Sequence, residues 1–304
     1  HSQTLKIFLN YLNFFNLMNI AIIASSKDPA GINIRNNLIK LFNFENTNEK
    51  VDSDMRVSSL RTRSQVADVF QFGKIKDKSI KLYLTNQDLI FAKNIDKKIN
   101  ADVFIFASKH RSKENTPSFT VHPIGNFGNA DFGGREKTLC PSSAILLKNL
   151  FLELNKNARE TDYEVSLEAT HHGPYTEKPA VFIEIGSTEK EWDGKENGEI
   201  IAKTIINGLD NENKNCKIAV GIGGTHYCNN FNKIVLRTDI AISHICPKYL
   251  LEKLDEDLIN QAIKKTVEKV DFVLLDWKGL GAEKRRIVNL LKNLNIEFKR
   301  TDRI

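Results

Sequence analysis

Short apolar runs that alternate with amphipathic stretches are the feature that most constrains the fold of this chain. Four such runs cover residues 20–24, 103–107, 217–221 and 271–277, and each one stops at a polar or glycine-bearing turn. Runs of this length between turn signals are typical of buried strands, and the stretches between them have the apolar spacing of helices. The alternation predicts an α/β protein with a three-layer body.

Residues 18–304 are expected to form the folded part of the chain. No repeat, low-complexity tract or obvious linker divides them, so the sequence predicts one α/β catalytic domain or two closely packed subdomains. Residues 1–17 begin with His-Ser-Gln and precede Met18, which opens directly into the first predicted strand. We expect residues 1–17 to be a tag or an upstream extension outside the fold. No segment approaches 18 apolar residues, so the sequence predicts a soluble, cytoplasmic protein without a membrane span.

Charge and cysteine content set weak limits on partners. Forty-four basic and 38 acidic residues give a net charge of +6, which is compatible with a polyanionic partner but does not by itself require one. The four cysteines have no CxxC spacing, so we expect free thiols in a reducing compartment. Cys228 and Cys246 each follow a histidine by two residues, which leaves a mixed Cys/His metal site open.

Two adjacent histidines, His171 and His172, are the strongest candidates for chemistry. They follow a predicted strand over residues 164–169 and are stopped at once by Gly173-Pro174. A strand end is a rigid platform that aims side chains, which suits a catalytic or binding site. An extended backbone points neighbouring side chains to opposite sides, so we expect only one of the two rings to face a substrate directly.

Four further histidines lie near predicted strand ends, and we expect them to converge on the same place: His110, His122, His226 and His244. Glu184 stands inside an apolar run, where a carboxylate must be paired, hydrogen-bonded or bound to metal. Such a set can act on water as a general acid and base, or it can hold a metal ion through three or four ligands. Neither HExxH nor HxH spacing is present, so the sequence leaves both options open.

Seven longer motifs occur in a characteristic order. They are Ser108-Lys-His-Arg-Ser112, Thr120-Val-His-Pro-Ile-Gly-Asn-Phe-Gly128, Glu168-Ala-Thr-His-His-Gly-Pro174, Phe182-Ile-Glu-Ile-Gly-Ser-Thr188, Gly221-Ile-Gly-Gly-Thr-His-Tyr227, His244-Ile-Cys-Pro-Lys-Tyr249 and Asp276-Trp-Lys-Gly279. This series resembles the archaeal and plant type of D-aminoacyl-tRNA deacylase, from Met18 nearly to the end of the chain. The resemblance implies a mixed sheet between helices, similar to the phosphorylase and peptidyl-tRNA hydrolase folds. It also implies zinc as cofactor and hydrolysis of the ester between a D-amino acid and the 3′ end of tRNA.

With that substrate in view, the candidate residues take provisional roles. The catalytic candidates are His171, His172, Glu184 and His226, and Glu168 is an alternative to Glu184 for orienting a histidine or accepting a proton. The metal-ligand candidates are His122, His171, His172, His226 and His244. The candidates for binding the substrate are Lys109, His110, Arg111, Gly223, Gly224, Tyr227 and Lys248, of which the two glycines would offer amides to an oxyanion.

Two other classes of function remain open from the sequence. A zinc-dependent amidohydrolase or peptidase would cleave small acylated or peptide substrates and would be indifferent to tRNA. A non-catalytic RNA-binding protein would bind tRNA in a salt-sensitive manner without deacylating it. The histidine-rich loops argue against the second class, and the moderate basicity fits tRNA better than a small substrate. We expect a monomeric enzyme, and the resemblance implies a role in translation quality control that removes D-amino acids from tRNA.

Overall fold

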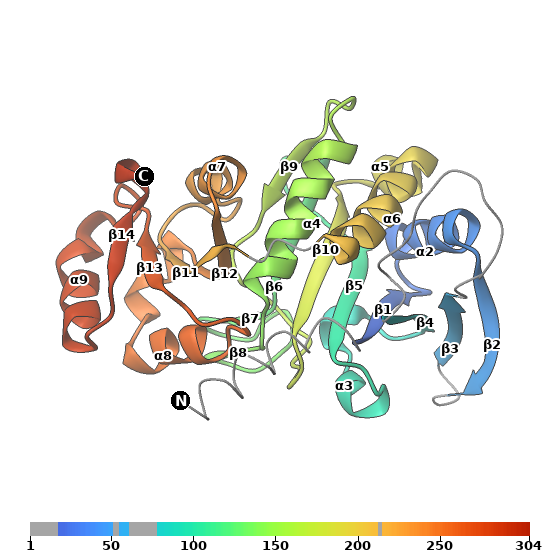
Figure 1. Cartoon of the computed structure of the whole chain (residues 1–304), viewed down its shortest axis with the longest axis horizontal. Helices are drawn as coiled ribbons and strands as arrows, with labels where there is room; N and C mark the ends of the chain where they lie inside the picture. The colour runs from blue at the N-terminus through green and yellow to red at the C-terminus, as the bar shows by residue number, and fades with distance from the viewer. Residues whose placement is uncertain (1–17, 51–54, 61–77, 212–214) are drawn as a thin grey trace.

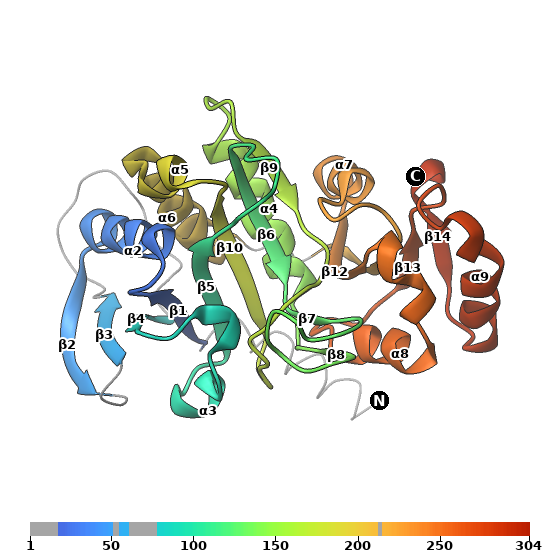
Figure 2. The same cartoon turned by 180° about the vertical axis from the view of Figure 1, so that it is seen from behind.

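A computed structural model describes residues 18–50, 55–60, 78–211 and 215–304 of the chain (Figure 1). The expectation that residues 1–17 are a tag or an extension therefore falls outside the described residues. Two sheets lie side by side along the long axis of the molecule, and helices pack on them (Figures 1 and 2). The predicted α/β class and mixed sheet are confirmed, and the second sheet is an addition to the prediction.

The large sheet has eight strands in the order β2-β3-β4-β1-β5-β10-β6-β9. The pairs around β1 and β5 are parallel, whereas β6 runs antiparallel to β10 and β3 runs antiparallel to both of its neighbours. The strands are β1 (Asn19–Ser25), β2 (Phe44–Lys50), β3 (Met55–Leu60), β4 (Ser79–Thr85), β5 (Val103–Lys109), β6 (Ser118–Pro123), β9 (Glu164–Leu167) and β10 (Ala180–Gly186).

Both faces of the central strands are buried, which explains their continuous apolar sequences. In β5, Val103, Ile105 and Ala107 pack into one hydrophobic cluster, and Phe104 and Phe106 pack into another on the opposite face. The first face carries α2 (Pro29–Phe42), α4 (Ala144–Asn157), α5 (Glu189–Asp193) and α6 (Lys195–Asp210) (Figure 1). The second carries the short helices η2 (Leu89–Phe91) and α3 (Ile95–Lys98).

The small sheet is parallel throughout, in the order β12-β11-β13-β14. Its strands are β11 (Lys217–Ile222), β12 (Ile240–Cys246), β13 (Phe272–Leu275) and β14 (Phe298–Arg300), and its helices are α7 (Asn229–Arg237), α8 (Glu256–Lys264) and α9 (Lys284–Asn293). The other short elements are the pair β7 (Gly125–Asn126) and β8 (Thr138–Leu139), with the 3-10 turns η3 (Lys248–Lys253), η4 (Gly281–Glu283) and η5 (Thr301–Arg303).

The two sheets are joined through the segment that follows β9. The amide of Ala169 donates to the carbonyl of His226 at 2.8 Å, and the amide of Thr170 donates to the carbonyl of Ile245 at 3.0 Å. Helix α4 packs on both sheets. These contacts place the loop after β9 against the loops of the small sheet.

No helix among the described residues is long and apolar enough to cross a membrane.

Candidate active site

A cavity of about 580 Å³ opens where the loops of the two sheets meet. The loop after β5 supplies His110, the segment after β9 supplies His171 and His172, strand β10 supplies Glu184, and the loop after β11 supplies His226. All five side chains line this cavity. The predicted convergence therefore occurs for His110, His171, His172 and His226, at the junction of the sheets, where each sheet contributes a part.

Glu168 is the centre of this cluster, although it is fully buried beneath the cavity. Its Oε2 lies 2.7 Å from Nε2 of His226 and 3.7 Å from Nε2 of His171, and its Oε1 lies 3.2 Å from Nδ1 of His110. Burial favours the neutral acid and would raise the pKa of Glu168. The hydrogen bond from His226 and the charges of the other histidines outweigh burial and lower that pKa well below its usual value.

Glu184 is a second buried carboxylate on the neighbouring strand. Its Oε2 lies 3.5 Å from Nδ1 of His110 and 3.7 Å from Nε2 of His122. Burial would raise the pKa of Glu184, but these two histidines outweigh it and lower the pKa to about 2. Burial in turn would lower the pKa of His110, and the carboxylates of Glu184 and Glu168 instead raise it to about 9. His110 is therefore a cation held between two anions.

Three histidines share one hydrogen-bonding pattern that fixes their tautomers. Nδ1 of His171 lies 2.8 Å from the carbonyl of Ala169, and Nδ1 of His122 lies 3.1 Å from that of Pro123. Nδ1 of His172 lies 2.6 Å from the carbonyl of the next residue. A carbonyl only accepts, so each Nδ1 carries the hydrogen, and in the neutral ring each Nε2 has a free lone pair.

The charge states of these three rings differ. Burial, followed by the charges of neighbouring histidines, lowers the pKa of His171 well below its usual value and lowers the pKa of His172 to about 4. Both rings are therefore neutral at physiological pH. Burial would also lower the pKa of His122, but Glu184 and Glu168 outweigh it and raise that pKa, so the field at His122 favours a positive charge.

Both rings of the adjacent pair face the cavity, so the expectation that only one would do so is wrong. The ring centroids of His171 and His172 lie 4.3 Å apart, and those rings lie 4.1 and 4.7 Å from the ring of His122. The cause is local: β9 ends at Leu167, and His172 has a left-handed backbone with φ of 47°. The alternation of side chains that a strand would impose does not reach the pair.

Close backbone packing holds this turn in place. A Cβ atom on Gly173 would lie 2.3 Å from both the amide nitrogen of Gly134 and the carbonyl oxygen of Ile90. The amide of Gly125 donates to the carbonyl of His172 at 3.0 Å. The loop therefore needs glycine at position 173 so that three segments can meet behind the histidines.

The cluster contains three sets of side chains that could hold a metal ion. Three sets of possible ligand atoms each lie within 4.8 Å of one another: His122, His171 and His172; Glu168, His171 and His226; and His110, Glu168 and Glu184. Nε2 of His122 and Oε1 of Glu168 are buried and form no hydrogen bond within the described parts of the chain. Imidazole and carboxylate donors suit zinc, so the residues present fit the ion that the resemblance implies.

Several predicted residues lie outside this cluster. His244 is buried elsewhere, with Nδ1 at 3.3 Å from Thr170 Oγ1, and it belongs to none of the three ligand sets. The amide of Gly223 already donates to the carbonyl of Cys246, and neither Gly224 nor Lys248 lines the cavity. The buried thiols of Cys228 and Cys246 likewise belong to none of these sets of described residues, which leaves the mixed Cys/His site without support.

Three predicted residues do join the site, and one residue that was not predicted joins it as well. Tyr227 Oη lies 3.0 Å from Nε2 of His110, and Lys109 and Arg111 line the cavity. Tyr249 was not among the candidates, yet its hydroxyl lies 3.1 Å from Nδ1 of His226. Tyr249 is the last residue of the motif His244–Tyr249, so the sequence does point to it. The sequence does not show that its hydroxyl lies close to His226. The same applies to Glu168, whose central position depends on the junction of the two sheets.

Comparison with known proteins identifies relatives over most of the chain. The family model described as D-aminoacyl-tRNA deacylase matches residues 97–299. The D-aminoacyl-tRNA deacylase of Thermococcus kodakarensis is 36% identical over 92% of this chain and 98% of that protein. The D-aminoacyl-tRNA deacylase of Methanocaldococcus jannaschii is 37% identical over 93% of this chain and 100% of that protein. The crystal structure of AF0625, a conserved protein of unknown function, matches with a TM-score of 0.81 and 31% identity, and the match covers 95% of this chain and 96% of that one.

Proposed function

Because the chain belongs to the D-aminoacyl-tRNA deacylase family, we propose that it hydrolyses the ester bond of D-aminoacyl-tRNA and releases the free D-amino acid and tRNA. The observation that carries the proposal is the single cavity in which neutral histidines stand beside two buried carboxylates. An aminoacyl ester is already activated, so hydrolysis needs only a nucleophilic water and stabilisation of the developing oxyanion.

His171 is the general base of the metal-free site in this proposal. Its Nδ1–H is held by the carbonyl of Ala169, and its Nε2 has a lone pair and lines the cavity in a neutral ring. Water attacks the ester carbonyl while Nε2 takes its proton, and the carboxylate of Glu168 at 3.7 Å stabilises the imidazolium that results. The same proton then passes to the ribose oxygen that leaves.

His226 and His172 complete the acid–base set. The Nε2–H of His226 donates to Glu168, and the hydroxyl of Tyr249 donates to its Nδ1, so this ring is fixed from both sides. His172 offers a second neutral Nε2 beside that of His171. Glu184 keeps His110 protonated, and the cation of His110 at the cavity wall offsets negative charge as it develops on the ester.

Zinc is the cofactor we propose for this site. His122, His171 and His172 would hold it through their three Nε2 atoms, and Glu168 with His226 offers further donors next to them. An Nε2 atom that binds zinc is not available as a base, so in the metal-bound site Glu184, which lines the cavity, would take the proton from the water in place of His171. When bound, zinc lowers the pKa of a water molecule and polarises a carbonyl group, which is the chemistry that ester hydrolysis requires. The three backbone carbonyls that accept from Nδ1 would orient these ligands.

The substrate-binding roles fall on the rim of the cavity. Lys109 and Arg111 provide positive charge for the tRNA backbone, and Tyr227 supports His110. Gly223, Gly224 and Lys248 have no place in this scheme because they lie off the cavity. One chain supplies the entire cluster, so we propose that the active unit is a monomer, acting on tRNA in the cytoplasm as a step of translation quality control.

The test is the release of amino acid from matched D- and L-aminoacyl-tRNA, with and without a chelator. The proposal expects rapid release of the D-amino acid and much slower release of the L-amino acid. Cleavage of acylated amino acids or peptides without turnover of the tRNA ester would instead identify an amidohydrolase or peptidase. Salt-sensitive binding of tRNA without any release would identify a non-catalytic RNA-binding protein.

A further inference from the structure

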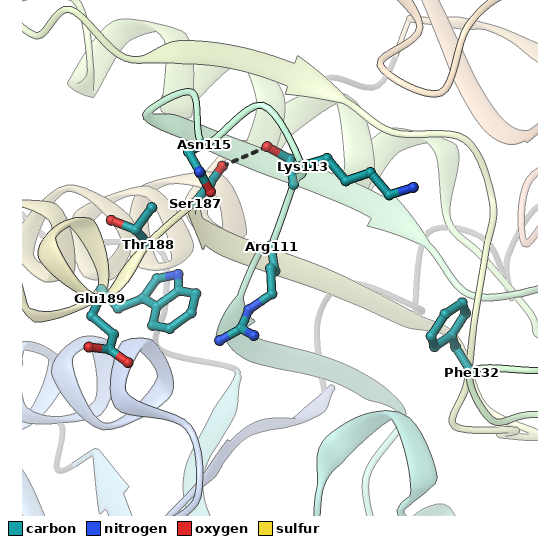
Figure 3. A pocket seen from close by; sticks show the side chains of 9 residues that line it. Arg111, Lys113, Asn115, Phe132, Ser187, Thr188 and Glu189 are labelled. Carbon is teal, nitrogen blue, oxygen red and sulfur yellow. Dashed lines mark hydrogen bonds between the residues drawn. The ribbon is translucent and has the colours of Figure 1, made fainter.

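A second cavity, of about 800 Å³, adjoins the histidine cavity and has no part in the proposed chemistry (Figure 3). Its walls come from the loop after β5 and from the segment after β10, and Phe132 stands on the opposite side. Arg111 and Phe132 line both cavities, so the two are adjacent at these residues. A substrate whose ester reaches the histidines can therefore extend into the second cavity.

The second cavity is basic on the side of the β5 loop. Arg111 and Lys113 are both exposed there, and Lys113 extends toward the side on which Phe132 stands (Figure 3). The guanidinium of Arg111 lies 5.1 Å from the ring centre of the buried Trp192, which supports it from behind. Glu189 on the far wall is the acidic residue among the lining side chains. An anionic ligand would therefore lie toward the β5 loop and away from Glu189.

Phe132 adds a flat apolar surface at the boundary of the two cavities. Its side chain is 68% exposed, which is the highest value among the exposed large hydrophobic residues of the described chain. Aromatic rings on which nucleic-acid bases stack are exposed in this way, because every base has an apolar face to cover. The combination of one open ring with two exposed cations is typical of sites for single-stranded nucleic acid.

We propose that the second cavity holds the 3′-terminal nucleotide of tRNA, with the adenine stacked on Phe132 and the adjoining phosphate held by Arg111 and Lys113. This assignment rests on the proposed function. In the substrate one ribose carries the ester, the terminal base and the terminal phosphate. When the ester lies among the histidines, the base and the phosphate must lie at the boundary of the cavity, which is where Phe132 and Arg111 stand.

Two substrates separate the base contact from the phosphate contact. D-aminoacyl-adenosine contains the ester and the base but no phosphate, whereas D-aminoacyl-tRNA contains all three. Phe132→Ala is expected to raise KM for both substrates by about 5- to 160-fold, the range for the loss of one stacked base. Arg111→Ala combined with Lys113→Ala is expected to raise KM much more for the tRNA ester than for the adenosine ester.

Binding of uncharged tRNA tests the assignment independently of catalysis. Each lost contact to a single-stranded phosphate should reduce the slope of log Kd against log salt by about 0.7, so the double variant should have a shallower slope than wild type. Removing the terminal adenosine from tRNA while leaving its phosphate in place should weaken binding to wild type and have little effect on Phe132→Ala. Phe132→Tyr, which keeps the ring, should retain wild-type affinity.

Matched controls lie away from the cavity. Leu236→Ala removes another exposed apolar side chain, on α7, and Lys97→Ala removes a lysine on α3, which precedes the opposite end of β5. Both should retain wild-type KM and salt slope. Wild-type KM on both substrates and an unchanged salt slope in the folded cavity variants would overturn the assignment. If the cavity variants change tRNA binding as expected but the wild-type protein releases no D-amino acid, the assignment of the cavity is supported and the proposed hydrolysis is refuted.

Discussion

Nε2 of His226 lies 2.7 Å from Oε2 of Glu168, and this contact joins the loop after β11 of the small sheet to the segment after β9 of the large sheet. Glu168 is fully buried and also contacts His110 and His171. A buried carboxylate with several cationic or hydrogen-bonding partners is tolerated because those partners replace its water. Glu168 therefore both joins the two sheets and holds the acid–base residues in position.

Glu168→Gln keeps the size of the side chain but removes its charge. Because an amide stabilises an imidazolium poorly, we expect kcat for D-aminoacyl-tRNA to fall by about 100-fold or more. The measurement is a single-turnover assay on protein shown to be folded by circular dichroism. Glu164→Gln, on the exposed start of β9, is the matched control and should keep wild-type activity.

Tyr249→Phe removes one hydroxyl, the one that donates to Nδ1 of His226. The net value of such a bond is about 1 kcal/mol, so we expect roughly a fivefold decrease in kcat with KM nearly unchanged. Steady-state kinetics on D-aminoacyl-tRNA measures the two constants separately. An unchanged kcat would mean that this hydrogen bond does not orient His226 during turnover.

Metal binding should depend on the ring of His171, which belongs to two of the three ligand sets. We expect His171→Ala to lower the affinity for zinc by at least about 100-fold, since even loss of a supporting hydrogen bond costs 10- to 100-fold. Metal analysis after dialysis against graded zinc buffers gives the affinity. His244→Gln, outside all three sets, should bind zinc as wild type does, and equal loss in both variants would contradict the ligand assignment.

The metal-free protein should lose stability as pH rises from about 6.5 to 9. The pKa of His110 is raised to about 9 in the folded state, so the folded protein binds more protons than the unfolded one across this window. The stabilisation from His110 is complete below pH 6.5 and is lost as pH passes 9. Denaturant titrations at both ends of the window measure the slope, and His110→Gln should flatten it.

Gly173→Ala should both destabilise the fold and disturb the site. The added Cβ would lie 2.3 Å from two backbone atoms, so one of three packed segments must move. Overpacking of this kind costs about 1–3 kcal/mol in free energy of unfolding. Urea titration measures that cost, and an alanine variant as stable and as active as wild type would show that the loop behind His172 is not tightly packed.

The sequence predicts the elements of this site better than their arrangement. Apolar runs locate the strands, and turn signals place His110, His171 and His226 just beyond strand ends, where they are found. Periodicity describes one segment at a time. It does not indicate that β9 and β11 lie in different sheets, whose end loops are joined by backbone hydrogen bonds. The central position of Glu168 follows from that junction.

Two of the expectations that the structure does not support have local causes. Strand alternation does not apply to His172 because its backbone is left-handed, so the two neighbouring rings share a cavity. His244 is on β12, in a motif similar to the others, but its side chain bonds to Thr170 within the junction between the sheets. A histidine that faces the cavity and one that bonds within the junction of the sheets are distinguished only by the packing around them.

The most direct test of this account is the single-turnover hydrolysis of matched D- and L-aminoacyl-tRNA by wild type, His171→Ala and His172→Ala. Wild type should cleave the D ester much faster than the L ester. Both folded variants should lose most of this activity, because each lacks a neutral Nε2 in the cavity. Wild-type rates on the D ester in both variants would contradict the claim that this histidine pair performs the reaction.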